Sequence, residues 1–332
     1  MSNLLRKLLQ GFQNGWLGLL SFSAILILLW GTLAPVGTMV WWLDGGAEDF
    51  EERARRILFE DEPAAENATI PLCYIVFLTG VGDFSADELA SGEEIFLDRL
   101  EQAQPDCVMV RDVFPYSAAN QNIGGQEIFA FLWDIAEDAD GWLEATRYLL
   151  QFRNLWRLAI SADDRYGQVY NRAIALSIVE QMNQQNPVPP NADEPIQLIL
   201  MGTSGGAQVG LAAVPYLNNW LNVDITVLSF GGVFDGQDGF DAADRVYHFR
   251  GEEDWVENIG GIVFPSRWAW TFRSPFNRAR NEGRYIAIIS GPHEHDGDRG
   301  YFGEAAIEGK EKTYLDLMFE QVMELPLWQE ET

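Results

Sequence analysis

The chain has 332 residues, of which 47% are hydrophobic and 22% charged, a composition typical of globular rather than disordered proteins. Its net charge of −28 argues against a nucleic-acid partner, because no broad basic surface is left to neutralise phosphates. Two cysteines and three histidines are few for a metal enzyme, and neither cysteine lies in a metal-spaced cluster.

The N-terminal part of the chain predicts a membrane anchor. After a tail over residues 1–16, residues 17–43 carry no charge, and about 20 such residues suffice for a helix to cross a bilayer. Trp16, Trp41 and Trp42 lie at the two ends of this run, where indole rings favour the interface. A cleavable signal peptide, the alternative, would have a shorter apolar core and a small-residue cleavage site. We therefore expect one transmembrane helix over residues 17–43.

The orientation of this helix depends on the basic residues at its ends, which nearly balance. Arg6 and Lys7 precede it, whereas Arg53, Arg55 and Arg56 follow at a greater distance. Because a short basic tail before a first span usually stays in the cytoplasm, we expect a single-pass protein with an extracytoplasmic main domain, in the periplasm or a lumen.

A charged linker over residues 44–69, which includes a charged helical stretch, leads to a domain expected over residues 70–325. Short β-favouring runs recur through this domain, and helical patterns such as residues 91–104 and 208–221 lie between most of them. The expected strands are residues 73–79, 107–114, 196–201, 225–230, 245–250 and 285–290. This alternation predicts an α/β fold with a mainly parallel sheet and helices on both faces.

The interval between the second and third expected strands is too long for one crossover. It contains helical patterns over residues 126–138, 142–160 and 166–184. We expect the third helix to pack on the sheet just before the next strand. The first two predict a helical cap inserted at about residues 115–165.

The third expected strand runs into Gly202-Thr203-Ser204-Gly205-Gly206, and a small-residue segment follows. A Gly-x-Ser-x-Gly sequence between a strand and a helix is typical of a nucleophile elbow, a sharp turn that lifts a serine hydroxyl clear of the sheet. Glycine suits positions 202 and 206 because larger side chains there would collide with backbone. The N–H of Gly205 then becomes an oxyanion donor. The alternative is a glycine-rich loop with an incidental serine.

A serine becomes a useful nucleophile only beside a base, and the chain has three histidines to choose from. His248 lies inside an expected strand, which suggests a packed residue. His293 and His295 follow the last strand, at a carboxyl end where ligand sites form in parallel sheets. We favour His295 as the base, because the turn at residues 296–297 lets its side chain project back into the site. His293 is the alternative.

The base needs a third group to orient it. Asp254 is the best candidate, because it follows the strand over residues 245–250 at another carboxyl end of the sheet. Glu253 and Glu252 are the alternatives, and all three acids could instead be solvated loop residues.

The order of Ser204, Asp254 and a loop histidine resembles that of the α/β-hydrolase family. Residues 202–206 resemble the family's nucleophile turn, residues 251–256 its acid loop and residues 291–295 its histidine loop. The match covers roughly residues 70 to 325 and excludes the membrane segment. The resemblance implies an α/β-hydrolase fold and acyl transfer to water through a Ser-His-Asp triad, with no cofactor and no metal.

The resemblance also implies a second oxyanion donor from the loop after the first strand, here residues 79–83. Val81 or Gly82 would supply this N–H, and the glycines of the loop permit close approach of the backbone. The sequence departs from the family in one respect, since Thr79 stands where the family often has a histidine. The donors are backbone groups, so the departure does not remove them.

In the strand order of this family, the strands that begin at Cys73 and Cys107 are neighbours. Parallel neighbours place such positions within bonding distance, and a disulfide would suit an extracytoplasmic domain. Two buried free thiols are the alternative, which we favour slightly.

Residues 267–284 hold five arginines and four aromatic residues in an otherwise acidic chain. One interpretation is a surface that docks on lipid headgroups or receives an anionic part of the substrate. We favour the other, a cap helix whose arginines pair with the many surrounding acids.

Together these features predict a membrane-anchored serine hydrolase that cleaves a carboxylic ester, with lipid and acyl esters among the candidates. A third interpretation is acyl transfer or amide hydrolysis by the same triad. The alternative from another class is a catalytically inactive binding or scaffold protein at a membrane. A fold alone does not decide between them.

Overall fold

The computed structural model describes residues 46–59, 71–80, 89–113, 158–163, 167–188 and 194–328. The predicted tail, the predicted span over residues 17–43 and most of the predicted cap at 115–165 lie outside these ranges. Within the described part of the chain, no helix combines the length and the apolar character that crossing a bilayer requires.

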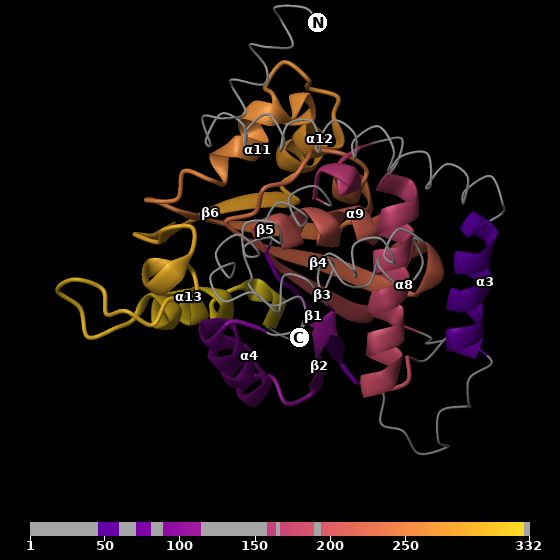
Figure 1. The fold of residues 1–332 in the computed structure, drawn as a ribbon, viewed down its shortest axis with the longest axis horizontal. Helices are drawn as coiled ribbons and strands as arrows, with labels where there is room; N and C mark the ends of the chain where they lie inside the picture. The colour runs from indigo at the N-terminus through magenta and orange to yellow at the C-terminus, as the bar shows by residue number, and fades with distance from the viewer. Residues whose placement is uncertain are drawn as a thin grey trace, which may run out of the picture.

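The described residues form an α/β fold around one parallel sheet of six strands (Figure 1). The strand order is β2-β1-β3-β4-β5-β6, and each strand runs parallel to its neighbours. The strands are β1 (Cys73–Leu78), β2 (Cys107–Val113), β3 (Ile196–Thr203), β4 (Val223–Phe230), β5 (Arg245–Gly251) and β6 (Tyr285–Gly291). Each lies within two residues of its predicted bounds, because buried parallel strands are read from the sequence as short apolar runs.

Alternate side chains of each strand enter two separate cores. Tyr74, Val76 and Leu78 of β1 point to one face, which α8 (Gly167–Gln185) and α9 (Gly205–Trp220) cover. Ile75 and Phe77 point to the other face, which α4 (Ser91–Ala103) and α13 (Tyr314–Met323) cover. Helices therefore lie on both faces of the sheet, as the sequence predicts.

Short elements connect the later strands and close the chain. They are α10 (Gly239–Ala242), α11 (Asn258–Val263), η1 (Pro265–Arg267), α12 (Pro275–Asn281), η2 (Gly297–Arg299) and η3 (Pro326–Trp328). In Figure 1, α11 and α12 stand together beyond the edge strand β6. The segment between β5 and β6 is thus a long excursion, which returns to the core through Phe276 and Ala279 of α12.

A helix inside the predicted linker belongs to the packed structure. α3 (Gly46–Phe59) lies against α8 as an outer layer (Figure 1). Their contact is formed by small and aliphatic side chains: Ala54 of α3 with Val169, Ala173 and Leu176 of α8. The packed part of the chain therefore begins before residue 70, where the sequence analysis places the start of the domain.

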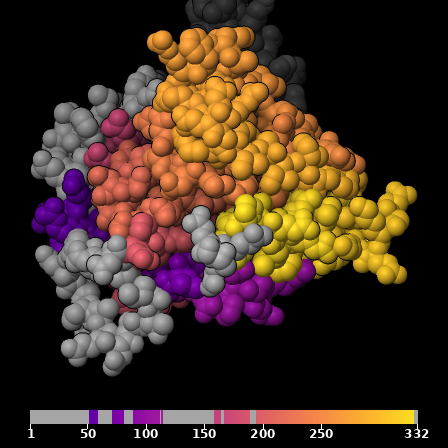
Figure 2. Space-filling model, turned by 180° about the vertical axis from the view of Figure 1, so that it is seen from behind, coloured from indigo at the N-terminus to yellow at the C-terminus, as the bar shows by residue number. Residues whose placement is uncertain are grey.

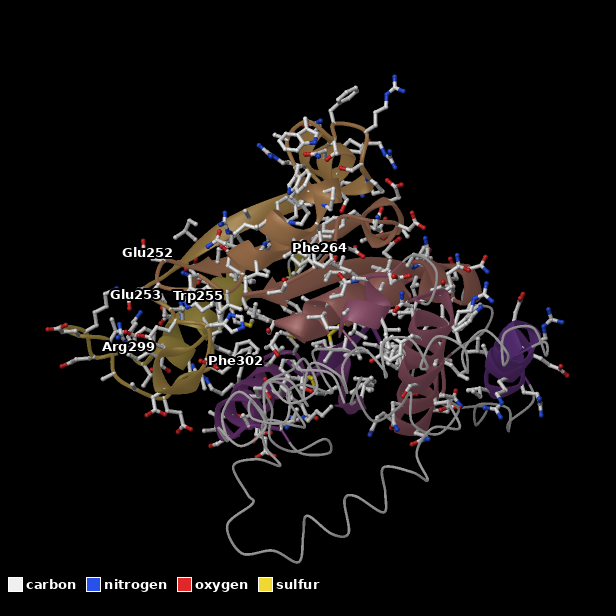
Figure 3. The ribbon with its side chains drawn as sticks, turned by 45° about the horizontal axis from the view of Figure 1, so that its top comes forward. Glu252, Glu253, Trp255, Phe264, Arg299 and Phe302 are labelled. Carbon is white, nitrogen blue, oxygen red and sulfur yellow. A yellow bond between two sulfur atoms is a disulfide. The ribbon has the colours of Figure 1, made fainter. Side chains whose placement is uncertain are left out.

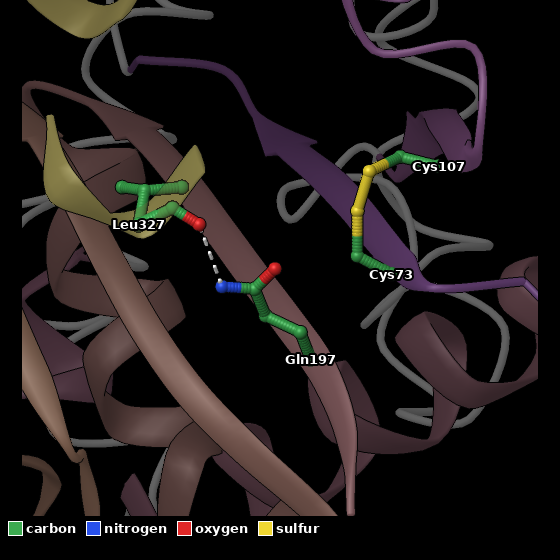
Figure 4. The surroundings of a disulfide bond; sticks show 4 residues. All are labelled: Cys73, Cys107, Gln197 and Leu327. Atoms are coloured by element: carbon green, nitrogen blue, oxygen red, sulfur yellow. Dashed lines mark hydrogen bonds between the residues drawn. A yellow bond between two sulfur atoms is a disulfide. The ribbon is translucent and has the colours of Figure 1, made fainter. Parts of the chain in front are cut away.

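Cys73 and Cys107 form a disulfide between β1 and β2 (Figure 4). The two residues are direct register partners at the starts of the paired strands, with Cα atoms 4.6 Å apart. The expectation of two free thiols is therefore wrong, because the strand register brings the two side chains to the same point. Beside the disulfide, the Gln197 side chain donates to the Leu327 carbonyl at 3.3 Å and fastens the C-terminal segment to β3 (Figure 4).

Replacing both cysteines by serine will destabilise the fold. The disulfide joins residues 34 positions apart, and closing a loop of this size contributes roughly 3–4 kcal/mol by restricting the unfolded chain. Thermal unfolding of the full chain, with and without a reducing agent, measures the effect. The reductant should lower the melting temperature of the wild type and leave that of the double variant unchanged. Equal melting temperatures for wild type and variant would contradict the prediction.

Candidate active site

Ser204 lies on the sharp turn between β3 and α9, with φ 47° and ψ −119°. Among the described residues it is the only non-glycine residue with a positive φ. Such a conformation costs roughly 1–3 kcal/mol and persists only where the surrounding structure enforces it. The turn therefore has the strained geometry that the elbow sequence predicts.

The two flanking glycines let this turn pack against backbone. A Cβ at position 202 would lie 2.6 Å from the Ala207 nitrogen, and one at position 206 would lie 2.3 Å from the Leu78 carbonyl oxygen. Real Cβ atoms do not approach that closely, so both positions require glycine. Strand β1 consequently lies directly against the start of α9.

Two backbone hydrogen bonds fix the serine from the side of β4. The N–H of Ser204 donates to the Phe230 carbonyl at 3.0 Å, and the N–H of Val233 donates to the Ser204 carbonyl at 3.1 Å. Together with the glycine contacts, these bonds hold the residue from both neighbouring strands.

His295 reaches Ser204 from the loop that follows β6. Its Nε2 lies 3.0 Å from Ser204 Oγ, and its Nδ1 lies 2.9 and 3.0 Å from the two carboxylate oxygens of Asp254. An ionised carboxylate only accepts hydrogen bonds, so Nδ1 carries the proton and Nε2 is free to accept one from the serine hydroxyl. The structure thus brings together the three residues that the sequence analysis favours.

Asp254 is buried, and four donors surround its carboxylate. Besides His295, the Tyr301 hydroxyl donates to Oδ2 at 2.8 Å, and the backbone N–H groups of Val256 and Glu257 donate to Oδ1 at 2.8 and 3.3 Å. Burial alone would raise the pKa of Asp254, but the bonds and charge of His295, followed by the bonds from Tyr301 and Glu257, bring it below its ordinary value. The group therefore stays ionised at neutral pH.

Tyr301 is a residue of the site that the sequence analysis missed. Its hydroxyl donates to Asp254 and accepts from the Gly251 N–H at 2.8 Å, so it links the acid to the end of β5. Burial, the charge of Asp254 and the bond to it raise the pKa of Tyr301, which keeps the hydroxyl protonated as a donor. No motif marks a tyrosine in this loop, and only the three-dimensional contact identifies it.

The alternative histidines have other partners. His293 is fully buried, and its Nε2 lies 3.1 Å from the Tyr314 carbonyl oxygen. His248 is fully buried on β5, with Nδ1 2.8 Å from the Tyr285 hydroxyl, as expected for a packed strand residue. Burial lowers the pKa of both, so both stay neutral in the interior.

The alternative acids point to solvent instead of the serine. Glu252 and Glu253 are exposed, and Glu253 forms an ion pair with Arg299 at 2.7 Å. Figure 3 shows Glu253 and Arg299 on adjacent loops at the edge of the molecule. Among these three acids, only Asp254 bonds His295 in the described structure.

The predicted oxyanion donors are only partly described. Gly205 is the first residue of α9, so its N–H has no carbonyl partner within the helix. Val81 and Gly82 lie outside the described residues. Gly80, just before them, lies beside the elbow: a Cβ built on it would be 3.3 Å from Ser204 Cβ. Gly80, at the start of the loop after β1, therefore lies next to the serine.

Within the described ranges, no group of three or more His, Cys, Asp or Glu residues is arranged to hold a metal ion. The chemistry available from the described site is that of a serine hydroxyl, an imidazole and a carboxylate in series. Such a series can activate the hydroxyl as a nucleophile.

Comparison with known proteins gives only distant likenesses. No family model matches the sequence, and no curated protein matches it. Among solved structures, a dienelactone hydrolase-like promiscuous phosphotriesterase, P91, from metagenomic libraries has 11% identity and a TM-score of 0.37, covering 78% of this chain and 87% of its own. A structure named m3DLH has 12% identity and a TM-score of 0.34 with the same coverage. A functional conclusion therefore rests on the geometry of the site.

Substituting Gly206 by alanine will disturb the elbow far more than the same change one turn later in α9. The new methyl at 206 would meet the carbonyls of Leu78 and Thr79, and such overpacking against backbone costs about 3 kcal/mol. At Gly210 the nearest atom is the end of the Leu78 side chain at 3.0 Å, which can move. Denaturant unfolding of both variants measures the difference. Equal destabilisation by the two changes would contradict this account.

Proposed function

We propose that the protein is a serine hydrolase in which Ser204 is the nucleophile, His295 the general base and Asp254 the group that orients the base. The observation that supports this proposal is the continuous hydrogen-bonded series from Ser204 Oγ through the imidazole to a buried carboxylate. A histidine that only fills space in the core would not be expected to contact a strained serine through one nitrogen and a buried, ionised acid through the other.

The reaction is acyl transfer to water in two stages. Ser204 Oγ bonds to the carbonyl carbon of an ester while its proton passes to His295 Nε2, and the departing alcohol then takes this proton from Nε2. An acyl ester on Ser204 remains. Water attacks it in the same way, giving a proton to Nε2, and the carboxylic acid leaves as Ser204 regains its proton.

Negative charge on the carbonyl oxygen needs donors in place before the reaction. Gly205 N–H supplies one, and the loop after β1, with Val81 or Gly82, supplies the second in this proposal. Each such donor is typically worth about 3 kcal/mol in the transition state. Neither these groups nor the triad requires a cofactor.

The substrate class and the location are parts of the same proposal. The substrate is a carboxylic ester, with esters of lipids among the candidates. Residues 17–43 anchor the protein, and the hydrolase domain lies outside the cytoplasm. The disulfide supports this location, because such bonds persist in oxidising compartments and are rare in the cytosol.

A fluorophosphonate probe tests the nucleophile directly. The probe should label the wild type on Ser204 and fail to label the Ser204→Ala variant. His295→Ala should lower hydrolysis of a p-nitrophenyl ester by about 10³-fold, because the general base is gone. His293→Ala, the matched control from the same loop, should retain activity within about tenfold of the wild type.

The opposite pattern would overturn the assignment. A folded wild type that the probe does not label would favour the inactive scaffold. Greater loss from His293→Ala than from His295→Ala would move the base. With labelling established, p-nitrophenyl esters of increasing chain length separate short-acyl from lipid-like substrates.

Tyr301→Phe should lower kcat about tenfold and raise the pH at which Asp254 takes up its proton, which is followed as the most acidic step of the pH profile. The hydroxyl helps to keep the pKa of Asp254 low, so its loss raises that pKa. Asp254 loses its charge as the pH falls through its pKa. Because this pKa is higher in the variant, the charge is lost at a higher pH than in the wild type. A bond to a charged group is typically worth about 1.5–3 kcal/mol, enough for a tenfold effect.

The control is Tyr314→Phe, which removes another buried tyrosine hydroxyl of this region, one that accepts from Arg299 at 3.1 Å. Its pH profile should match that of the wild type. If Tyr301→Phe also leaves the profile in place, then Tyr301 only fills space.

A further inference from the structure

The excursion between β5 and β6 carries a concentrated apolar surface. We call residues 258–281, which include α11, η1 and α12, the projection; Figure 2 shows this part of the chain in orange at the top of the molecule. Its last helix, α12, packs on the core through Phe276 and Ala279, and its exposed apolar side chains lie between residues 262 and 272. Eight large hydrophobic side chains are prominently exposed among the described residues, and four of them lie here: Ile262, Val263, Trp270 and Phe272, each at least 58% exposed. Single exposed apolar residues are ordinary, but a cluster in one short segment indicates a binding surface.

Two contacts of Trp268 connect the end of α11 to the turn that carries the exposed rings. The Trp268 indole N–H donates to the Ile262 carbonyl at 3.3 Å, and the Trp268 ring packs against the Trp270 ring with centroids 4.8 Å apart. The indole of Trp268 therefore bridges the end of α11 and the turn that carries Trp270 and Phe272.

The projection is held in a defined shape. The buried Asn277 side chain donates to the carbonyls of Trp268 and Thr271, each at 2.9 Å, and the Thr271 hydroxyl donates to the Trp268 carbonyl at 2.6 Å. Below the turn, the Arg267 guanidinium lies over the Phe234 ring. The exposed rings are thus presented by a bonded turn instead of a loose loop.

The charge of the projection is opposite to that of the chain. Residues 258–281 contain no acid and four arginines, in a protein whose net charge is −28. Arg278 forms an ion pair with Asp241, and Arg284, just beyond the projection, forms one with Glu282. These two arginines fit the interpretation that the arginines pair with acids. Arg273 and Arg280 are exposed and form no ion pair within the described part of the chain. Arg273 lies at the patch, with its guanidinium over the Phe272 ring at 5.6 Å, and Arg280 follows in the last turn of α12.

We propose that the projection docks on the surface of an anionic lipid bilayer. Indole and phenyl rings favour the headgroup layer, and guanidinium groups pair with phosphate through two parallel bonds. A protruding patch can sink into a deformable headgroup layer, whereas a protein partner would need a groove of matching shape. This contact depends neither on the triad nor on residues 17–43.

A fluorescent label at the tip tests the proposal in the full chain. Phe272→Cys is labelled with a nitrobenzoxadiazole dye, while Cys73 and Cys107 remain in their disulfide. Leu72→Cys is the matched control, because Leu72 is also 65% exposed. The protein is combined with vesicles of phosphatidylcholine alone, or of phosphatidylcholine and phosphatidylglycerol in equal amounts. Emission and quenching by spin-labelled lipids are then measured.

With the anionic vesicles, the emission of the label at 272 should shift to the blue and be quenched by the spin-labelled lipids. With vesicles of phosphatidylcholine alone, both the shift and the quenching should be at most half as large. The label at 72 should respond to neither. Adding Arg273→Glu and Arg280→Glu together should abolish the response at 272. This variant should keep its melting temperature and its esterase activity, because neither arginine belongs to the catalytic site.

An unshifted label at 272 in anionic vesicles overturns the proposal. So does a shift that follows protein concentration without lipid and accompanies cross-linked dimers, which would make a second copy the occupant. Because the label reports local contact with lipid, these outcomes are independent of whether the fluorophosphonate probe reacts with Ser204.

Discussion

The site depends on one strained residue, Ser204, and on the strands that hold it in place. Its backbone conformation is unfavourable by roughly 1–3 kcal/mol, so the turn would relax in an isolated peptide. Packing of β1 carbonyls against Gly206 and hydrogen bonds to Phe230 and Val233 prevent this relaxation. Burial of apolar side chains on both faces of the sheet offsets the unfavourable free energy of this backbone conformation. The position of one hydroxyl thus follows from the register of three neighbouring strands.

The loop that carries Asp254 must hold a buried carboxylate whose two oxygens both accept hydrogen bonds. Asp254 receives donors from three directions, and one of them is the backbone N–H of Glu257. Glu257 is itself buried and accepts two bonds from Arg250, at 2.6 and 2.8 Å. Because an unpaired charge in the interior is costly, this second ion pair fixes the loop that orients the first carboxylate. The acid is therefore held from the end of β5 on one side and by Tyr301 on the other.

The strands could be predicted, and so could the proximity of Ser204, His295 and Asp254, because each leaves a local pattern. Apolar runs mark buried parallel strands, and Ser204 lies in a motif whose glycines have a steric reason. Other features depend on contacts between distant segments. Tyr301 lies 47 residues from Asp254 and has no motif, and the pairing of Cys73 with Cys107 depends on strand register. The packing of α3 on α8 could not be predicted either, since it uses small residues within a charged stretch.

The choice between the two loop histidines shows how packing assigns roles to nearly adjacent residues. His293 stacks on the Tyr301 ring with centroids 5.4 Å apart, and its carbonyl accepts from the Glu253 N–H. A Cβ on Gly251 would lie 2.1 Å from that carbonyl oxygen, so the loop after β6 lies directly against the end of β5. His293 thus joins the acid loop to the histidine loop, while His295, two residues later, faces the serine. The contact between the two loops is made by the backbone carbonyl of His293 and does not depend on its imidazole, so the two nearby histidines have separate roles in the packing.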